Sequence, residues 1–308
     1  MRLDKIAIIG SGAVGLYYGG LLARDGRNVH FLLRSDLNAV REKGIRILLP
    51  AGDVRLHPVS AHADTAGIGP VDLVIIALKT TANRALPDLI PPLLHDHTAL
   101  LTLQNGLGNE AFLAQRFGKE RVLGGLCFIC LNRTAPGEVA NLHKGSLNIG
   151  SHLGDGDQRP AALAKAFQDA GVKARAVPDL REARWRKLIW NVPFNGLTIA
   201  AGGIDTRQLL ASPALTGEVE ALMREIQATA RALGMEIEDA FLEQQLAVTK
   251  TMGAYRPSSL VDFQTGRPLE VDSIWAAPLD AARQAGVRAP RLSLLHALLQ
   301  RLDPARDA

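Results

Sequence analysis

The sequence has little of several features that mark specialised classes of protein. It contains two cysteines in 308 residues, Cys127 and Cys130, which argues against a disulfide framework and fits a reducing cytoplasm. No apolar stretch approaches the roughly 20 residues needed to span a bilayer, and the apolar run at 6–9 is too short for the core of a signal peptide. Lysines and arginines do not form a run of about five like charges, although the net charge is +4. We therefore expect a cytoplasmic protein that binds neither membranes nor nucleic acids.

The two cysteines are spaced Cys-x-x-Cys, as in some metal and redox sites. They fall in the almost wholly apolar segment 125–131, which predicts a buried strand, and residues three apart on a strand face opposite sides of the sheet. The sequence has no second cysteine pair to complete a zinc site. His95 and His97 also have metal-like spacing, but their surroundings indicate a loop without further ligands nearby. We predict buried structural cysteines and no metal site.

The sequence does have the composition of a folded protein, with 47% hydrophobic and 21% charged residues, and a length that suits two domains. In its first half, short apolar runs alternate with helical patterns. This alternation predicts parallel strands joined by right-handed crossovers, with the sheet covered on both faces. The predicted strands are 5–9, 28–33, 73–78, 99–103, 121–131, 147–149 and 172–177, with a helix at 161–170 before the last.

The pattern changes after Pro178, where most segments acquire helical periodicity. The predicted helices are 179–195, 212–233, 237–250, 258–266, 270–285 and 291–301. Ser212-Pro213 is a typical helix start, with a capping serine before proline at the first helical position. We therefore predict an α/β fold in two domains. A Rossmann-like domain with a mostly parallel sheet would span 1–178, and an all-helical domain would span 179–308.

A glycine-rich loop directly after the first predicted strand indicates a dinucleotide site. In the pattern Gly-x-Gly-x-x-Gly, the first glycine permits a tight turn, the second lets a pyrophosphate approach the backbone, and the third lets the helix pack on the strand. The N-terminus of that helix offers N–H groups and a positive dipole end to the phosphates. The predicted cofactor-binding residues here are Gly10, Ser11, Gly12, Ala13, Val14 and Gly15.

The end of the second strand bears on which nicotinamide cofactor binds. An NAD site usually places an acid about 20 residues after the glycines, where it binds the ribose hydroxyls. Here the strand ends in Arg34, and a guanidinium favours the 2′-phosphate of NADP. We therefore predict NADPH, while Asp36, two residues later, leaves NAD open.

Two polar residues follow later strands of the predicted sheet. Lys79 comes after the strand at 73–78, and Asn105 comes after the strand at 99–103. Ligands of open α/β sheets bind outside the carboxyl ends of the strands. Both side chains are therefore candidates for a site beside the glycine loop.

A stripe of one amine and two amides lies in the helical half. Lys187, Asn191 and Asn195 are spaced i, i+4 and i+8, which aligns them on one face of a helix. Pro193 is expected to perturb this helix, which leaves the register of Asn195 open. From spacing alone, a solvated face and a functional face are equally good interpretations.

Together these features resemble the ketopantoate reductase family. The resemblance rests on the glycine loop, Arg34, Leu78-Lys79, Gln104-Asn105-Gly106, Lys187 with Asn191 and Asn195, and a final block from Pro257-Ser258 through Asp262 to Gly266-Arg267-Pro268-Leu269-Glu270. It implies an NADP-dependent oxidoreductase that reduces 2-dehydropantoate (ketopantoate) to pantoate with NADPH. That reaction is a step towards pantothenate and coenzyme A.

The resemblance also implies the roles of the reacting groups. Lys187 would be the general acid, which stabilises the developing alkoxide and delivers a proton. Glu270 would orient the substrate hydroxyl, help set the charge state of Lys187 and contact the cofactor. Lys79 and Asn105 would bind both cofactor and substrate.

The remaining substrate contacts follow from the same resemblance. Asn191, Asn195 and Ser258 would hold the hydroxyl and carboxylate of the substrate, with Ser258 rather than Ser259 in the place of the family's serine. The sequence departs from the family pattern where proline, methionine and threonine are usual, at Gly196, Ser259 and Leu269 respectively.

Three alternatives stay open at this point. The chain could reduce another small 2-keto or 3-keto acid, or it could be a 3-hydroxyacid dehydrogenase, which the Glu270 block disfavours. It could also be a non-catalytic NADP-binding sensor, against which the presence of both Lys187 and Glu270 argues. The expected partner is a small keto acid, and a homodimer is left open.

Overall fold

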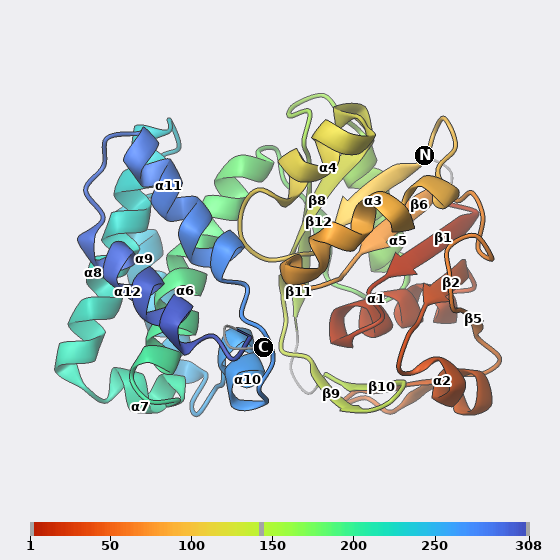
Figure 1. Ribbon diagram of the computed structural model, residues 1–308, viewed down its shortest axis with the longest axis horizontal. Coiled ribbons are helices and arrows are strands. Elements are labelled where there is room, and N and C mark those ends of the chain that lie inside the picture. The colour runs from red at the N-terminus through yellow and green to blue at the C-terminus, as the bar shows by residue number, and fades with distance from the viewer. Residues whose placement is uncertain (1–2, 142–144, 306–308) are drawn as a thin grey trace. The chain divides into compact units, whose positions relative to one another are not determined.

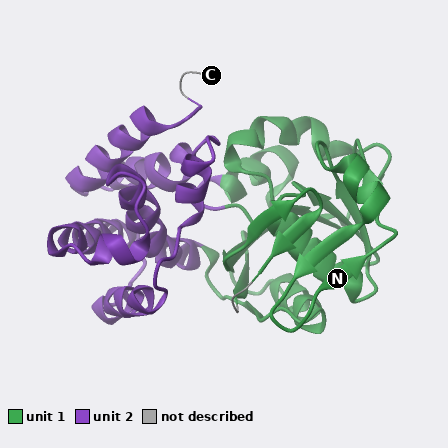
Figure 2. Cartoon of the chain, turned by 90° about the horizontal axis from the view of Figure 1, so that it is seen from below, with its two compact units in different colours: residues 1–104, 109–180 green, residues 105–108, 181–308 purple. Residues whose placement is uncertain are grey.

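The structure, a computed structural model, describes residues 3–141 and 145–305 and divides into two compact units (Figure 2). Unit 1 comprises Met1–Gln104 and Asn109–Leu180, and unit 2 comprises Asn105–Gly108 and Arg181–Ala308. The short segment Asn105–Gly108 thus belongs to unit 2, although it interrupts unit 1 in the sequence.

Unit 1 is built on an eight-stranded sheet in the order β12-β11-β8-β7-β6-β1-β2-β5. All neighbouring strands are parallel except β8 and β11. The chain runs outward from β1 to β2 and β5, then returns to β6 and continues in the other direction to β7 and β8, as in a Rossmann fold. The strands are β1 (Lys5–Ile9), β2 (Asn28–Leu32), β5 (Ser60–His62), β6 (Leu73–Ile76), β7 (Ala99–Thr102), β8 (Val122–Phe128), β11 (Ser146–Ser151) and β12 (Ala174–Ala176).

Helices cover both faces of this sheet (Figure 1). Ile6 and Ile8 of β1 share a core with α1 (Ala13–Arg24) and α5 (Arg159–Asp169). Ala7 and Ile9 point to the other core, which includes side chains of α3 (Leu86–Leu89) and α4 (Asn109–Phe117). Burial on both faces explains why β1 is a continuous apolar run rather than an alternating one. The predicted Rossmann-like first half is confirmed.

A second, four-stranded sheet in unit 1 was not predicted. Its order is β4-β3-β10-β9, and it follows α2 (Leu37–Lys43) in the chain. Its strands are short, and all four residues of the last of them are exposed, so their apolar pattern is weak. They are β3 (Ile45–Leu48), β4 (Val54–Leu56), β9 (Asn132–Ala135) and β10 (Glu138–Ala140).

The prediction for the two cysteines was wrong in part. Strand β8 ends at Phe128, because the chain there leaves the large sheet for β9. Cys127 therefore lies on the strand, whereas Cys130 lies beyond it, and both thiols are half-buried rather than buried.

Unit 2 is helical, as predicted. Ser212 caps α8 by accepting a hydrogen bond from the Leu215 N–H at 3.4 Å, which is the predicted start. A short helix, α7, was not foreseen, and a π-helical turn at Asp272–Ala276 precedes α11. None of the described helices is both long and apolar enough to cross a membrane. The helices are α6 (Leu180–Ala200), α7 (Thr206–Leu210), α8 (Pro213–Ala232), α9 (Asp239–Thr251), α10 (Ser258–Gln264), α11 (Ala277–Gln284) and α12 (Pro290–Leu302).

Candidate active site

The glycine loop of unit 1 is shaped by close backbone contacts. Gly10 has a φ of +100°, and a Cβ there would lie 2.3 Å from the Leu78 nitrogen. A Cβ on Gly15 would lie 2.2 Å from the Gly10 oxygen, whereas Gly12 has open space around it. The loop after β1 thus passes against the end of β6, where the strand order reverses, and leaves room at Gly12 for a phosphate. The first N–H groups of α1 follow directly.

Ser11 joins this loop to the end of β2. Its Oγ donates a hydrogen bond to the Leu32 carbonyl at 2.8 Å. Arg34 follows two residues later with an exposed side chain. The guanidinium predicted to bind the 2′-phosphate therefore lies at the surface beside the glycine loop.

The carboxylate of Asp36 forms an ion pair and hydrogen bonds with other residues of unit 1. Its side chain is 4% exposed and forms an ion pair with Arg133 of β9. The Gly137 N–H and the Ser35 hydroxyl also donate to this carboxylate, each at 3.0 Å. The acid that left NAD open in the sequence thus has hydrogen-bond partners at both oxygens.

The ends of β6 and β7 are tied together by a buried amide. Gln104 is 3% exposed, and its Nε2 donates to the Leu78 carbonyl at 3.0 Å and to the Asn83 Oδ1 at 2.7 Å. Lys79 follows Leu78 with an exposed side chain. Gln104, which appeared in the sequence only as part of a motif, therefore fixes the strand end that presents Lys79.

In unit 2, Asn105 is bonded to the predicted general acid. The Lys187 Nζ donates to the Asn105 Oδ1 at 2.8 Å. Gly106 has a φ of +80°, and a Cβ there would lie 2.3 Å from the Ser273 oxygen. The Leu107 N–H donates to that same oxygen at 2.9 Å. The π-helical turn around Ser273 therefore holds the segment that presents Asn105.

Helix α6 continues through Pro193 as far as Ala200. Pro193 has no N–H to donate to the Ile189 carbonyl one turn earlier. Next to it, the Trp275 Nε1 donates to the Val192 carbonyl at 3.0 Å. The Asn195 Nδ2 donates to the Asn191 carbonyl at 3.1 Å, one turn earlier. The expected perturbation does not change the register, so Lys187, Asn191 and Asn195 share one face.

Asn195 also contacts the start of α10. Its Oδ1 accepts a hydrogen bond from the Ser259 N–H at 3.0 Å and lies 3.5 Å from the Ser258 Oγ. The Ser258 side chain is exposed, whereas Ser259 is 2% exposed. Of the two hydroxyls, that of Ser258 is the one within reach of a ligand.

Glu270 lies just before the π-helical turn. It is 3% exposed, and its carbonyl accepts a hydrogen bond from the Ile274 N–H at 3.1 Å. The carbonyl of Ser273, three residues later, accepts the hydrogen bond from the Leu107 N–H. One turn of unit 2 thus positions both Glu270 and the segment that contains Asn105.

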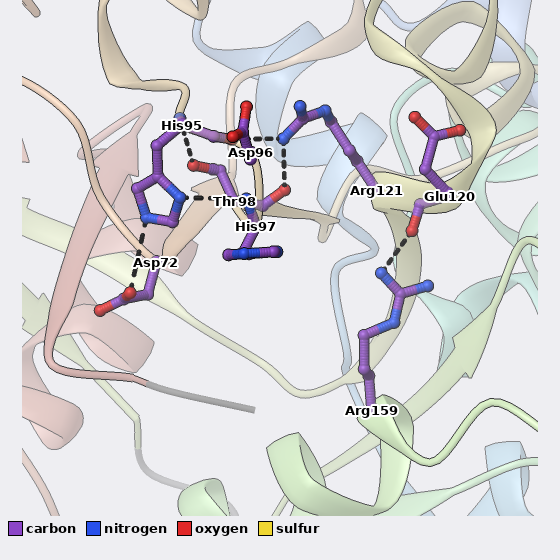
Figure 3. A pocket seen from close by; sticks show the side chains of 8 residues that line it. All are labelled: Asp72, His95, Asp96, His97, Thr98, Glu120, Arg121 and Arg159. Carbon is purple, nitrogen blue, oxygen red and sulfur yellow. Dashed lines mark hydrogen bonds and ion pairs between the residues drawn. The ribbon is translucent and has the colours of Figure 1, made fainter.

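A separate pocket of about 590 Å³ (Figure 3) lies at the amino ends of the strands, where the chain enters β6, β7 and β8. Arg121 donates there to the carbonyls of His95 and Thr98 at 2.7 and 3.2 Å, and the His95 Nε2 lies 3.5 Å from an Asp72 carboxylate oxygen. The described residues contain no group of three or more side chains that could hold a metal ion. Several polar groups of this pocket bond to one another, and it lies away from the carboxyl ends of the strands.

Comparison with known proteins gives a match along most of the chain. A family model described as "Ketopantoate reductase PanE/ApbA" matches residues 6–154, and one described as "Ketopantoate reductase PanE/ApbA C terminal" matches residues 179–303. The chain is 39% identical to a 2-dehydropantoate 2-reductase from Nostoc sp., over 98% of this chain and 96% of that protein.

Solved structures agree with this match. A 2-dehydropantoate 2-reductase from Geobacter metallireducens has a TM-score of 0.94 and 43% identity, and the match covers 96% of this chain and 99% of that one. A D-mandelate dehydrogenase solved with NADH and anilino(oxo)acetate has a TM-score of 0.88 at 23% identity over 99% of this chain and 100% of that one, a likeness of fold. The chain belongs to the ketopantoate reductase family.

Proposed function

We propose that this protein reduces 2-dehydropantoate (ketopantoate) to pantoate with NADPH, in the cytoplasm, as a step towards pantothenate and coenzyme A. The observation that supports this most is the 2.8 Å bond between the Lys187 Nζ and the Asn105 Oδ1. The Lys187 amine is half-buried, and helical spacing puts it on the same face of α6 as Asn191 and Asn195. The relatives from Nostoc and Geobacter metallireducens bear the name of this activity.

Lys187 acts as the general acid in this proposal. When bound, NADPH would supply the hydride for the ketone carbon, and negative charge would develop on the ketone oxygen. An ammonium that donates to this oxygen stabilises the charge and then delivers the proton. Because the Asn105 Oδ1 accepts one N–H of Lys187, it orients the ammonium before substrate arrives.

The polar groups around Lys187 suit a small hydroxy keto acid. Asn191, Asn195 and Ser258 offer amide and hydroxyl groups to the substrate's hydroxyl and carboxylate. Glu270 is a buried carboxylate, suited to accept a hydrogen bond from the substrate hydroxyl. We assign Lys79 of unit 1 to the anionic groups of cofactor and substrate.

The residues of unit 1 fit NADPH. The open space at Gly12 and the start of α1 suit the pyrophosphate, and the exposed Arg34 suits a 2′-phosphate. Asp36, which would bind ribose hydroxyls in an NAD site, already accepts hydrogen bonds from Arg133 and Gly137. This combination supports the proposed preference for NADPH.

The departures from the family pattern lie in the packed interior. Ser259 and Leu269 are each 2% exposed. A Cβ on Gly196 would lie 2.7 Å from a Leu295 side-chain carbon, so a larger residue there requires the neighbours to shift. The three departures therefore change side chains that pack against the protein interior. This supports the proposal that the chain retains the family's substrate.

The test is oxidation of NADPH by the purified protein with ketopantoate and with a panel of other 2-keto and 3-keto acids. We expect the highest kcat/KM for ketopantoate, and a loss of about a thousand-fold in kcat for Lys187→Ala with unchanged binding of NADPH. Faster turnover of another acid would assign the protein to that substrate instead. Tight NADPH binding without turnover of any acid would identify a sensor.

A further inference from the structure

We propose that Arg133 determines the cofactor preference by neutralising and occupying Asp36. In this way the acid after β2 neither binds the 2′-hydroxyl of NADH nor repels the 2′-phosphate of NADPH. The inference rests on the proposed use of NADPH and assigns a specificity-determining role to a residue outside the glycine loop and β2.

The first argument is the position of Asp36. It follows Arg34 by two residues, at the end of the strand to which Ser11 ties the glycine loop through the Leu32 carbonyl. An acid in this region is what NAD sites use to bind both ribose hydroxyls. The chain therefore has an NAD-like acid and an NADP-like cation within three residues of sequence.

The second argument is that a distant hairpin engages this acid. The β9–β10 hairpin brings two donors to one carboxylate, the guanidinium of Arg133 on β9 at Oδ1 and the N–H of Gly137 in the turn at Oδ2. Gly137 has a φ of +72°, and a Cβ there would lie 3.0 Å from the Gly44 oxygen, so the turn is held tightly against the end of α2. These contacts span 97 and 101 residues of sequence.

The third argument concerns charge. Asp36 is 4% exposed and the Arg133 side chain is 37% exposed, so the pair shows mainly its cationic partner to solvent. Opposite charges this close compensate one another, whereas an unpaired carboxylate close to a bound 2′-phosphate would repel it. With Arg133 present, the charge of Asp36 is compensated, and the side chain that this pair exposes is that of the cation.

A different result is expected if the ion pair between Arg133 and Asp36 has only a structural role. If the ion pair only holds the loop in place, removal of either partner disturbs Arg34 and changes cofactor preference in the same direction. If Arg133 acts by masking the acid, removal of Arg133 and removal of the acid have opposite consequences.

The experiment measures dissociation constants of NADPH and NADH by titration calorimetry, without substrate. We expect Arg133→Gln to lower the preference for NADPH by about ten-fold, because the negative charge of Asp36 is then no longer compensated and its Oδ1 loses the guanidinium donor. Asp36→Asn should keep the wild-type preference or increase it. The double variant Arg133→Gln with Asp36→Asn should recover most of the preference lost in the single one.

The matched control is Arg46→Gln. Arg46 lies on β3 of the same small sheet and pairs with Asp53 and Glu138 at 2.6 and 2.8 Å, so its loss removes an equal charge without touching Asp36. We expect no change in preference. Arg133→Lys, which keeps the charge, should also retain it and covers the case in which Arg133→Gln does not fold.

Two results would overturn the inference. One is an equal preference in Arg133→Gln and Arg46→Gln, and the other is a parallel loss in Arg133→Gln and Asp36→Asn. A wild-type protein that binds NADH more tightly than NADPH would instead refute the proposed cofactor, which keeps the two failures distinct.

Discussion

Asn105 accepts a hydrogen bond from Lys187 at 2.8 Å across 82 residues of sequence. Asn105 directly follows a strand end of unit 1, yet it belongs to unit 2 with Lys187. The proposed acid and the amide that orients it are therefore held within one compact unit. We expect this bond to control proton delivery more than substrate binding.

The first prediction concerns that bond. Asn105→Ala leaves the Lys187 ammonium without this acceptor, so kcat for ketopantoate should fall by about ten- to a hundred-fold, as expected when a charged hydrogen bond is lost. The measurement is steady-state kinetics with a parallel determination of the NADPH dissociation constant. Wild-type kcat in Asn105→Ala would show that Lys187 needs no such orientation.

The second prediction concerns the packing that presents Asn105. Gly106→Ala places a Cβ 2.3 Å from the Ser273 oxygen, whereas Gly108, with a φ of +89°, has nothing within 4 Å. Both substitutions strain a left-handed backbone by roughly 1–2 kcal/mol, but only the first forces the segment away from Ser273. Gly106→Ala should therefore lower kcat and thermal stability well beyond Gly108→Ala. Equal effects of the two would mean that the contact with Ser273 is unimportant.

The third prediction separates two neighbouring serines. Ser258→Ala removes an exposed hydroxyl next to Asn195 and should raise KM for ketopantoate about ten-fold, with stability unchanged. Ser259→Ala keeps the N–H that binds Asn195 at 3.0 Å and should leave KM close to that of wild type. Kinetics and thermal melts of both variants decide the matter, and a higher KM in Ser259→Ala alone would reverse the assignment.

The fourth prediction concerns pH and stability. His30 lies on β2 with its Nδ1 3.0 Å from the His62 Nε2, and burial, helped by Lys5, lowers the pKa of His30 from 6.5 to about 4. The unfolded chain therefore binds a proton between pH 6.5 and 4 that the folded one does not. Stability should be complete above pH 6.5 and decrease as the pH falls towards 4, by about 2 kcal/mol after allowance for partial exposure.

Urea unfolding at a series of pH values measures this loss. His30→Gln should reduce the dependence on pH between 6.5 and 4, while His97→Gln, at an exposed loop position, should not. If His30→Gln has the same pH dependence as wild type, another group is responsible for the loss.

Much of this fold could be predicted because it depends on local patterns. The buried strands of the Rossmann sheet are continuous apolar runs, and Gly10–Gly15 lies between a strand and a helix, so both show in the sequence. The face shared by Lys187 and Asn191 follows from helical spacing alone. The continuation of α6 through Pro193 does not show in the local sequence, nor does the bond of Trp275 to the Val192 carbonyl beside it.

What could not be predicted depends on contacts between distant residues. The position of Asn105 requires Ser273, which lies 168 residues later. The small sheet has short, half-exposed strands with little periodicity, so neither the hairpin nor its ion pair with Asp36 shows in the sequence. The site predictions at Lys79 and Glu270 remain predictions, and the prediction at Ser258 is tested by the comparison of Ser258→Ala with Ser259→Ala.

The engaged carboxylate of Asp36 bears on how the redox specificity of such a chain can change. An acid is already encoded after β2, and a hairpin about a hundred residues away engages it; on the proposal above, it does not have to be introduced. Engineering towards NADH then becomes a matter of unmasking: a change at Arg133 combined with loss of Arg34 should accomplish what replacement of Arg34 alone does not.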